Sequence, residues 1–224
     1  MSTFILIPGA GGQSRWYWHR IVPLLRAGGS DAIAVDLPGL DESAGLREYA
    51  RIVTDVIGDT EDVVLVAASL GGFTAPLVAS AVALRGLVLV NAMIPVPGET
   101  AGEWWDHTQA LEAREAAAAA HGYSHDFDLD TYFFHDVPAQ VVASGEGQDF
   151  AEADAAFESA CDFTRWPDIP IRVVAGRHDR LFPVEFQQQV AAARLGLDPD
   201  VLPGGHLIAL AQPEPLARYL LAAG

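Results

Sequence analysis

The chain has 224 residues, of which half are hydrophobic and 19% are charged, and this length and composition fit one large domain and exclude a disordered chain. Its formal net charge of −17 at pH 7 disfavours a nucleic-acid partner, because an acidic surface repels phosphate backbones. All thirteen basic residues are arginines, which excludes a Schiff-base lysine, a P-loop lysine and a Tyr-x-x-x-Lys dehydrogenase site. Cys161 is the only cysteine, which excludes an internal disulfide and a cysteine zinc cluster.

Short apolar runs alternate with helical segments along most of the chain. Six runs predict strands, which in chain order are residues 4–7, 32–35, 63–66, 87–90, 171–174 and a short run near 201–202. Helices are predicted between and after them, at residues 16–25 with a soft break at Pro23, 46–57, 70–83 and 215–222. This alternation is typical of an α/β fold with a mainly parallel sheet and helices on both of its faces.

Residues 97–166 depart from this alternation. The segment is rich in alanine, acidic and aromatic residues, contains no convincing strand, and includes a strong helix-forming run at residues 116–120. We therefore expect a single α/β domain over residues 1–224, with a small helical cap inserted at about residues 97–166.

No segment has the pattern of a targeting signal or of a membrane span. The apolar run at residues 4–7 is short and follows no positively charged region. Residues 75–97 are long and apolar enough to cross a membrane, but Arg85, Gly86 and Asn91 interrupt them, and a helix, a turn and a buried strand explain them better. We expect a cytoplasmic protein with no membrane partner.

The strongest chemical signal is a serine between a buried strand and a helix. Ser69 follows the strand at residues 63–66, and the small residues Ala67 and Gly71 stand two positions before and after it. A nucleophile elbow requires this pattern, because its tight turn excludes bulky neighbours and exposes the serine hydroxyl at the strand end. The N-terminus of the following helix adds N–H donors and a positive partial charge. The alternative is a serine that only caps a crossover helix.

The glycine-rich loop at residues 8–12 gives a second signal. It follows the first strand and would present the backbone N–H of Ala10 to an oxyanion, with the N–H of Leu70, directly after the serine, as the second donor. The alternative is a dinucleotide site, since residues 9–14 match G-x-G-x-x-S and Asp36 follows the next strand. The missing third glycine and the bulky Trp-Tyr-Trp run after the loop count against that alternative.

An acid and a histidine follow two later strands. Asp179 comes after the strand at residues 171–174, and His206 comes after the one near 201–202. The chain order of Ser69, Asp179 and His206 is that of a triad in α/β enzymes, and all three lie beyond strand ends, where such sheets bind ligands. His206 would take the proton of the serine, and Asp179 would hold the imidazole in the required tautomer.

These motifs resemble the α/β-hydrolase superfamily, and in particular its small esterase-like members, which include plant methyl-ester hydrolases and hydroxynitrile lyases. The similarity extends over nearly the whole chain and includes the first strand with its glycine loop, residues 36–39, residues 204–206 and the last helix, with the insertion in place of the helical cap. The resemblance implies a nucleophile, an acid, a base and two oxyanion donors, which are Ser69, Asp179, His206, Ala10 and Leu70.

Two positions differ from the family pattern, and a third discriminates between its reactions. Pro8 stands where family members usually carry a histidine that shapes the oxyanion loop, and Ala67 replaces the first glycine of the elbow. The lyases of this group use a lysine beside the catalytic histidine, and here that neighbour is Leu207. The resemblance therefore implies hydrolysis in place of cyanohydrin cleavage.

Other polar residues near the predicted strand ends have competing interpretations. His178 is a rival base, but it sits directly beside Asp179, and adjacent side chains tend to point apart. Asn91 follows a strand where some family members keep an alternative acid, and an amide does not ionise. Within the insertion, His135 and Asp136 are too few to form a metal site.

We expect a serine hydrolase that cleaves a small, neutral, fairly apolar carboxylic ester through an acyl-enzyme and needs no cofactor or metal. The aromatic insertion, the absence of lysine and the acidic surface favour such a substrate over an anionic one. Hydrolysis of a lactone, a thioester or a C–C bond on the same triad stays open, as do a ligand-binding hydrolase fold with weak catalysis and a dinucleotide-binding protein. We expect a monomer or homodimer whose partner is a small-molecule ester.

Overall fold

The computed structural model describes residues 2–145 and 151–224, and within them it contains one sheet of six strands. In chain order the strands are β1 (Thr3–Ile7), β2 (Asp31–Ala34), β3 (Val63–Ala68), β4 (Gly86–Val90), β5 (Ile171–Gly176) and β6 (Asp200–Leu202). Every pairing is parallel, and each predicted strand is present within two residues of its predicted bounds. The α/β fold is thereby confirmed.

The strand order β2-β1-β3-β4-β5-β6 reverses beside β1. The chain passes from β1 to the edge strand β2, returns to the other side of β1 at β3, and then continues outward to β6. The register pairs Ile7 with Ala67, so β1 and β3 end at the same level. In α/β sheets ligands bind beyond the carboxyl ends of such strands. Here that position receives the loop at residues 8–12 and Ser69.

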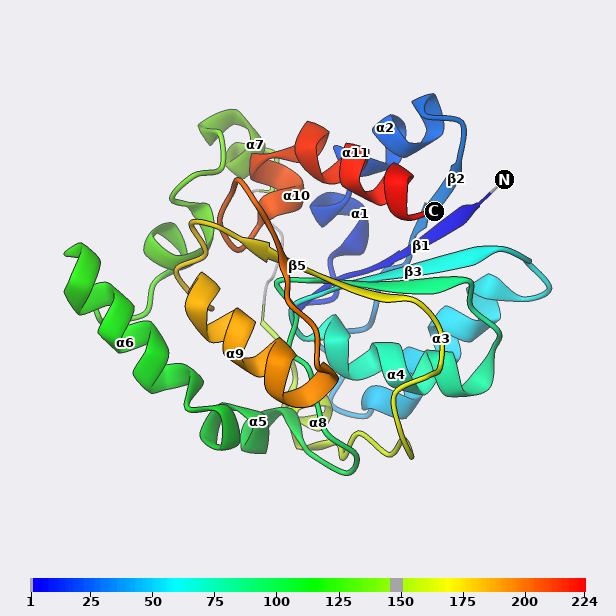
Figure 1. The fold of residues 1–224 in the computed structure, drawn as a ribbon, viewed down its shortest axis with the longest axis horizontal. Coiled ribbons are helices and arrows are strands. Elements are labelled where there is room, and N and C mark those ends of the chain that lie inside the picture. The colour runs from blue at the N-terminus through cyan, green and yellow to red at the C-terminus, as the bar shows by residue number, and fades with distance from the viewer. Residues whose placement is uncertain (1, 146–150) are drawn as a thin grey trace.

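Two layers of helices cover the faces of the sheet. On one face lie α3 (Leu46–Ile57), α4 (Gly71–Ala81) and α9 (Val184–Leu195), and on the other lie α1 (Ser14–Tyr17), α2 (Ile21–Ala27), α10 (Ile208–Ala211) and α11 (Pro213–Ala223) (Figure 1). Successive strand residues point to opposite faces, so Ile5 and Leu65 pack on the first layer, and Phe4 and Val64 pack on the second. Because both faces are covered, the central strands β3 and β4 are apolar and buried along their whole length.

The helices differ from the sequence prediction in two respects. The break predicted at Pro23 is wrong: α1 ends at Tyr17 and α2 begins at Ile21, so Pro23 lies in a first turn, where the backbone N–H has no intrahelical partner to lose. The sequence analysis also did not identify α9 and α10. In α9 the polar residue Gln187 is buried beside Val190, and this interrupts the apolar pattern that indicates a helix.

Between β4 and β5 the described residues form only helices and loops. The helices are α5 (Ala101–Thr108), α6 (Ala110–His121), the π-helix η1 (Asp130–Phe134), α7 (Ala139–Ala143) and α8 (Asp154–Glu158). In Figure 1, α6 and α7 lie on the left, toward the ends of the strands. We use the name cap segment for residues 97–166, of which residues 146–150 lie outside the described residues. In the part of the chain that is described, no helix has both the length and the apolar character needed to cross a membrane.

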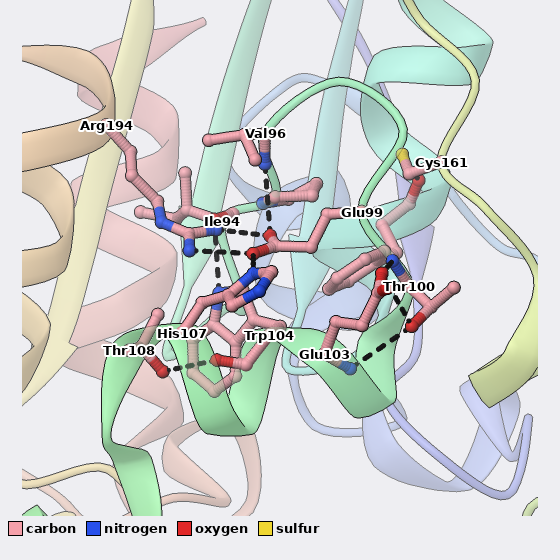
Figure 2. Close-up of polar contacts among 12 residues, drawn as sticks. Ile94, Val96, Glu99, Thr100, Glu103, Trp104, His107, Thr108, Cys161 and Arg194 are labelled. Atoms are coloured by element: carbon pink, nitrogen blue, oxygen red, sulfur yellow. Dashed lines mark hydrogen bonds and ion pairs between the residues drawn. The ribbon is translucent and has the colours of Figure 1, made fainter.

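A buried ion pair ties the start of the cap segment to α9. Glu99 is 3% exposed, and its carboxylate accepts hydrogen bonds from two nitrogens of Arg194 and lies 2.8 Å from His107 Nδ1 (Figure 2). Burial disfavours the charged carboxylate, but the hydrogen bonds from these partners outweigh it and hold the pKa of Glu99 below its ordinary value. Thr100 and Glu103 then form a capping box that starts α5. These contacts fix the point at which the cap segment leaves the sheet.

Candidate active site

Ser69 lies on a sharp turn between β3 and α4. Its φ of +48° is in the left-handed region, which a non-glycine residue adopts at an energetic cost. The backbone is held there by hydrogen bonds from Ser69 N–H to Val90 O at 3.2 Å and from Met93 N–H to Ser69 O at 3.0 Å. The N-cap residue of α4 is Leu70, and no side chain caps this helix. Ser69 is therefore not a helix cap, and the turn has the geometry of a nucleophile elbow.

The turn leaves no room for larger side chains. A Cβ on Gly71 would lie 2.5 Å from Pro8 O, and a Cβ on Gly72 would lie 1.8 Å from Met93 O. Ala67 is fully buried between β1 and β4, and its methyl group is accommodated. The small residues of the sequence pattern thus have a steric cause, and alanine satisfies it at the first position.

The three residues predicted to form a triad make one chain of contacts. His206 Nε2 lies 3.1 Å from Ser69 Oγ, and His206 Nδ1 lies 2.8 Å from Asp179 Oδ2. Because a carboxylate only accepts, Nδ1 donates to Asp179, and Nε2 is left to accept the proton of the serine. His206 and Asp179 are 2% and 5% exposed, whereas Ser69 is half-buried. The contacts therefore lead from an accessible hydroxyl into the interior.

The carboxylate of Asp179 is held at both oxygens. Its Oδ1 accepts from the N–H groups of Leu181 and Phe182, each at 2.9 Å, and its Oδ2 accepts from Gln187 Nε2 at 3.2 Å as well as from His206. Gln187 belongs to α9, the helix that the sequence analysis did not identify. These donors fix the rotamer of the carboxylate, which in turn orients the imidazole.

Asn91 holds the histidine loop from the side of the sheet. This residue is 1% exposed, and its Nδ2 donates to Gly205 O at 3.0 Å and to His206 O at 2.9 Å. Its Oδ1 accepts from Gly176 N–H at 2.6 Å. The sequence analysis considered this position only as an alternative acid. The contacts that it makes join residues 85 to 115 positions apart, and no local pattern indicates them.

The cap segment holds the same loop from the other side. Asp136 Oδ2 accepts from Gly205 N–H at 2.6 Å. His135 Nε2 lies 4.0 Å from Asp136 Oδ1, and both atoms are buried without a hydrogen-bond partner among the described residues. Residues 2–145 and 151–224 supply no third ligand for a metal beside this pair. His178, the rival base, is exposed and lines a second cavity together with His135.

The glycine-rich loop lies directly against the elbow. A Cβ on Gly9 would lie 2.7 Å from the Cβ of Ser69. Ala10 and Leu70 line the same cavity as Ser69, and within the described part of the chain their N–H groups donate no hydrogen bond. Two unused donors thus flank the serine, which is the arrangement that an oxyanion hole requires.

A carboxylate of the cap segment shapes this loop. Glu152 Oε2 accepts from Gly11 N–H at 2.6 Å, and the hydroxyl of Tyr49 donates to Glu152 Oε1. Burial raises the pKa of Glu152 above its ordinary value. Gly11 has a φ of +85°, a conformation that glycine adopts without strain. Where the family pattern has a histidine at Pro8, this protein holds the loop through Glu152.

The structure gives no support to the dinucleotide alternative. Asp36, which would bind a ribose in that alternative, accepts from Arg15 N–H at 2.8 Å and pairs with the Arg15 guanidinium at 3.0 Å. The helix after the loop, α1, has only four residues, and its Trp16 lines the cavity of Ser69. The loop therefore faces the serine and not a nucleotide site.

Ser69 and His206 open into a cavity of about 450 Å³. Most of its wall is apolar, and its aromatic residues are Trp16, Tyr17, Trp105, Phe127, Phe133, Phe134, Phe157 and Phe182. The rings of Phe133 and Phe182 meet the imidazole edge-on, with centroids 4.9 and 5.2 Å away. Besides His206 and Tyr17, the ionisable side chains among the lining residues are Arg114 and Glu152. The site thus combines a hydroxyl in contact with an imidazole and a largely apolar cavity.

Comparison with known proteins gives matches over the whole chain and over parts of it. The model of the "Alpha/beta hydrolase family" matches residues 4–219. A probable esterase from Oryza sativa subsp. indica is 32% identical over 111 residues, which is 44% of this chain and 42% of the relative. Methylesterase 7 from Arabidopsis thaliana is 30% identical over 105 residues, which is 41% of this chain and 40% of the relative. The matched stretches span less than half the length of these relatives.

Solved structures share the fold along the full chain. The crystal structure of polyneuridine aldehyde esterase has a TM-score of 0.79 at 19% identity and covers 100% of this chain and 99% of that one. The pyrethroid hydrolase from Sphingobium faniae JZ-2 has a TM-score of 0.75 at 23% identity, with 99% and 96% covered. These likenesses include the cap segment, since they extend over nearly every residue of both chains.

Proposed function

Because this chain belongs to the alpha/beta hydrolase family, as its sequence resemblance implied, we propose that it is a carboxylesterase-type serine hydrolase that cleaves small, neutral, fairly apolar esters through an acyl-enzyme. The observation that carries the proposal is the chain of contacts from Ser69 Oγ through His206 to Asp179, at 3.1 and 2.8 Å, beside an apolar cavity. The relatives named esterase and methylesterase support ester hydrolysis as the reaction.

Acylation begins when Ser69 Oγ attacks the carbonyl carbon of the ester and gives its proton to His206 Nε2. The carbonyl oxygen becomes an oxyanion, which accepts hydrogen bonds from the N–H groups of Ala10 and Leu70. Asp179 stabilises the imidazolium through its hydrogen bond with Nδ1. The carbonyl then re-forms, the bond to the alcohol oxygen breaks, and His206 gives its proton to the departing alcohol.

Deacylation repeats these steps with water as the nucleophile. His206 Nε2 takes a proton from water as the water oxygen attacks the acyl carbon, and the same two N–H groups hold the oxyanion. When the carbonyl re-forms, the bond to Ser69 Oγ breaks, and the proton on His206 returns to the serine. The products are a carboxylic acid and an alcohol, and the side chains end in their initial protonation states.

The size and the lining of the cavity support the substrate class. A volume of about 450 Å³ is typical of a small-molecule site, for which roughly 300–1,000 Å³ is usual. Aromatic walls favour apolar acyl and alcohol groups, because burying such surface in the site is favourable. The net charge of −17 disfavours the approach of polyanionic esters.

Labelling with a fluorophosphonate, followed by mapping of the adduct by mass spectrometry, tests the proposal. We expect an adduct on Ser69 that is lost in His206→Ala and retained in Ser43→Ala, a control at an exposed serine. A protein that takes no label but is stabilised by small ligands would instead be a ligand-binding member of the fold. Faster hydrolysis of lactones or thioesters than of esters would support the proposed triad but contradict the proposed ester substrate.

A further inference from the structure

Arg114 places a positive charge in the wall of the active-site cavity. It belongs to α6, is half-buried, and lines the cavity together with Ser69. Its guanidinium carbon lies 5.8 Å from the ring centroid of Phe127 and 5.1 Å from that of Tyr132. A guanidinium at these distances is attracted to the faces of both rings, so the two aromatic residues hold it in place.

The hydrogen-bonding capacity of Arg114 is not used within the described residues. Its side chain forms no hydrogen bond or ion pair there, and its Nε is buried without a partner. A guanidinium carries five N–H donors, and leaving such donors unpaired away from water is unfavourable. By contrast, Arg194, whose side chain is 11% exposed, donates to both carboxylate oxygens of Glu99. Arg114 is thus oriented, and its donors have no acceptor among residues 2–145 and 151–224.

The other charged side chain on the cavity wall does not provide that acceptor. Both carboxylate oxygens of Glu152 are already engaged, one by Gly11 N–H at 2.6 Å and the other by the hydroxyl of Tyr49. The remaining wall is mainly aromatic and aliphatic and offers few oxygen atoms. The Nη groups of Arg114 are not among the buried atoms without a partner, so they are the donors available to an acceptor on a molecule that occupies the cavity.

We propose that Arg114 is a specificity residue that donates a hydrogen bond to an uncharged carbonyl oxygen of the substrate, separate from the ester that Ser69 attacks. The substrate class is then a small ester with a second carbonyl group, a ketone, an aldehyde or an amide, in its acyl or its alcohol part. This inference rests on the proposed ester hydrolysis and narrows its substrate.

Charge favours an uncharged acceptor over a carboxylate. Glu152 lines the same cavity, and a substrate carboxylate would bring a second negative charge into a poorly solvated space beside it. The protein as a whole carries a net charge of −17, which opposes the entry of anions. A ketone or amide oxygen accepts from Arg114 without either penalty, and a hydrogen bond from a charged donor is stronger than one between neutral groups.

Pairs of esters that differ by a ketone test the proposal. Methyl 5-oxohexanoate is compared with methyl hexanoate for the acyl side, and acetonyl butanoate with propyl butanoate for the alcohol side. For each pair we take the ratio of kcat/KM for the ketone ester to kcat/KM for the alkyl ester. In at least one pair we expect Arg114→Met to lower this ratio by about tenfold or more, which corresponds to about 1.4 kcal/mol. Arg218→Met, at an exposed arginine of α11, is the matched control and should keep the ratio of the wild type.

Comparing ratios separates recognition from folding and from intrinsic reactivity. A merely structural role of Arg114 would lower both members of a pair equally, and unchanged ratios in both pairs would overturn the proposal. The proposal would also be overturned if Arg114→Met lowers kcat/KM for monomethyl glutarate, which carries a carboxylate, by a larger factor than it lowers kcat/KM for the ketone esters. If none of these esters is hydrolysed, ester hydrolysis itself fails, and calorimetric binding to Ser69→Ala decides the role of Arg114. There the ketone ester should bind about tenfold more tightly than the alkyl ester, and Arg114→Met should remove the difference.

Discussion

Exchanging Asn91 for aspartate replaces one NH₂ group by an oxygen and keeps the shape of the side chain. The replaced group donates to the carbonyl oxygens of Gly205 and His206, at 3.0 and 2.9 Å. In the variant a carboxylate oxygen would face these two carbonyl oxygens, and all three atoms can only accept hydrogen bonds. The oxygen that accepts from Gly176 N–H is retained. Asn91 has a φ of +45°, and aspartate tolerates this region about as well as asparagine, so backbone strain stays nearly constant.

The magnitude follows from the two carbonyl groups that lose their donor. Asn91 is 1% exposed, so water does not replace the lost hydrogen bonds, and each unsatisfied group costs about 1–3 kcal/mol. The free energy of unfolding should therefore fall by roughly 2–6 kcal/mol. In a protein of this size about 1 kcal/mol corresponds to about 2–4 °C, so Tm should fall by roughly 4–24 °C. Because the same loop carries His206, kcat should fall by about tenfold to a hundredfold.

Thermal unfolding and steady-state kinetics of Asn91→Asp measure both effects. Asp62→Asn is the matched control, since it makes the reverse exchange at an exposed residue with a φ of +55°. A surface exchange of this kind should change stability by less than about 0.5 kcal/mol. An Asn91→Asp variant with the Tm and kcat of the wild type would refute the positioning role that we assign to this amide.

Four further predictions address the site and its supports. Ser69→Ala should abolish ester turnover and leave Tm nearly unchanged, because its hydroxyl makes one hydrogen bond with a side chain; retained turnover would reject the nucleophile. Asp179→Asn should lower kcat by about 10⁴-fold through the wrong histidine tautomer, and a near-wild-type rate would place the acid elsewhere. Glu152→Gln should remove a pH dependence of the stability. In the wild type, burial raises the pKa of Glu152 in the folded state, so the folded protein binds this proton more tightly than the unfolded chain does. The wild type should therefore lose stability as the pH rises from the ordinary carboxyl pKa through the raised pKa, and the variant should not. Denaturant unfolding across the acidic range measures this, and equal slopes in both proteins would contradict it. Arg194→Met should lower the free energy of unfolding by about 3–5 kcal/mol because it removes the guanidinium from the buried carboxylate of Glu99, which then keeps His107 as its side-chain partner. Adding Glu99→Gln should recover part of the loss.

The strands, and the proximity of the three candidate triad residues, were predictable from the sequence for a single physical reason. A parallel strand covered on both faces is apolar along its length, so β3 and β4 appear as uninterrupted apolar runs. The residues just beyond such runs lie at one edge of the sheet, and this placed Ser69, Asp179 and His206 near one another before any coordinates were known. The helix α3 was predicted with its observed bounds because its buried and exposed residues alternate with helical periodicity.

The supports of the site were not predictable, because they join a polar side chain to a distant backbone atom. Asn91, Asp136 and Glu152 each bond to a loop that is 69 or more positions away in sequence, and no spacing rule indicates such a partner. Gln187 shows the same limit in another form. It interrupts the apolar face of α9, which hid the helix from the sequence analysis, and it does so because its amide donates to Asp179.

If the proposed function is correct, the contacts of the cap segment link substrate selection to catalysis. Asp136 bonds to Gly205 in the loop of His206, and Glu152 bonds to Gly11 in the oxyanion loop, so both loops take part of their position from residues 97–166. A substitution that shifts the cap segment would move the base and the oxyanion donors together, and we therefore expect it to change kcat as well as specificity. Arg114 differs, because its side chain forms no hydrogen bond with either loop among the described residues. Substitutions there should act on the choice of substrate, and this separates the recognition function of the cap segment from its support of the catalytic loops.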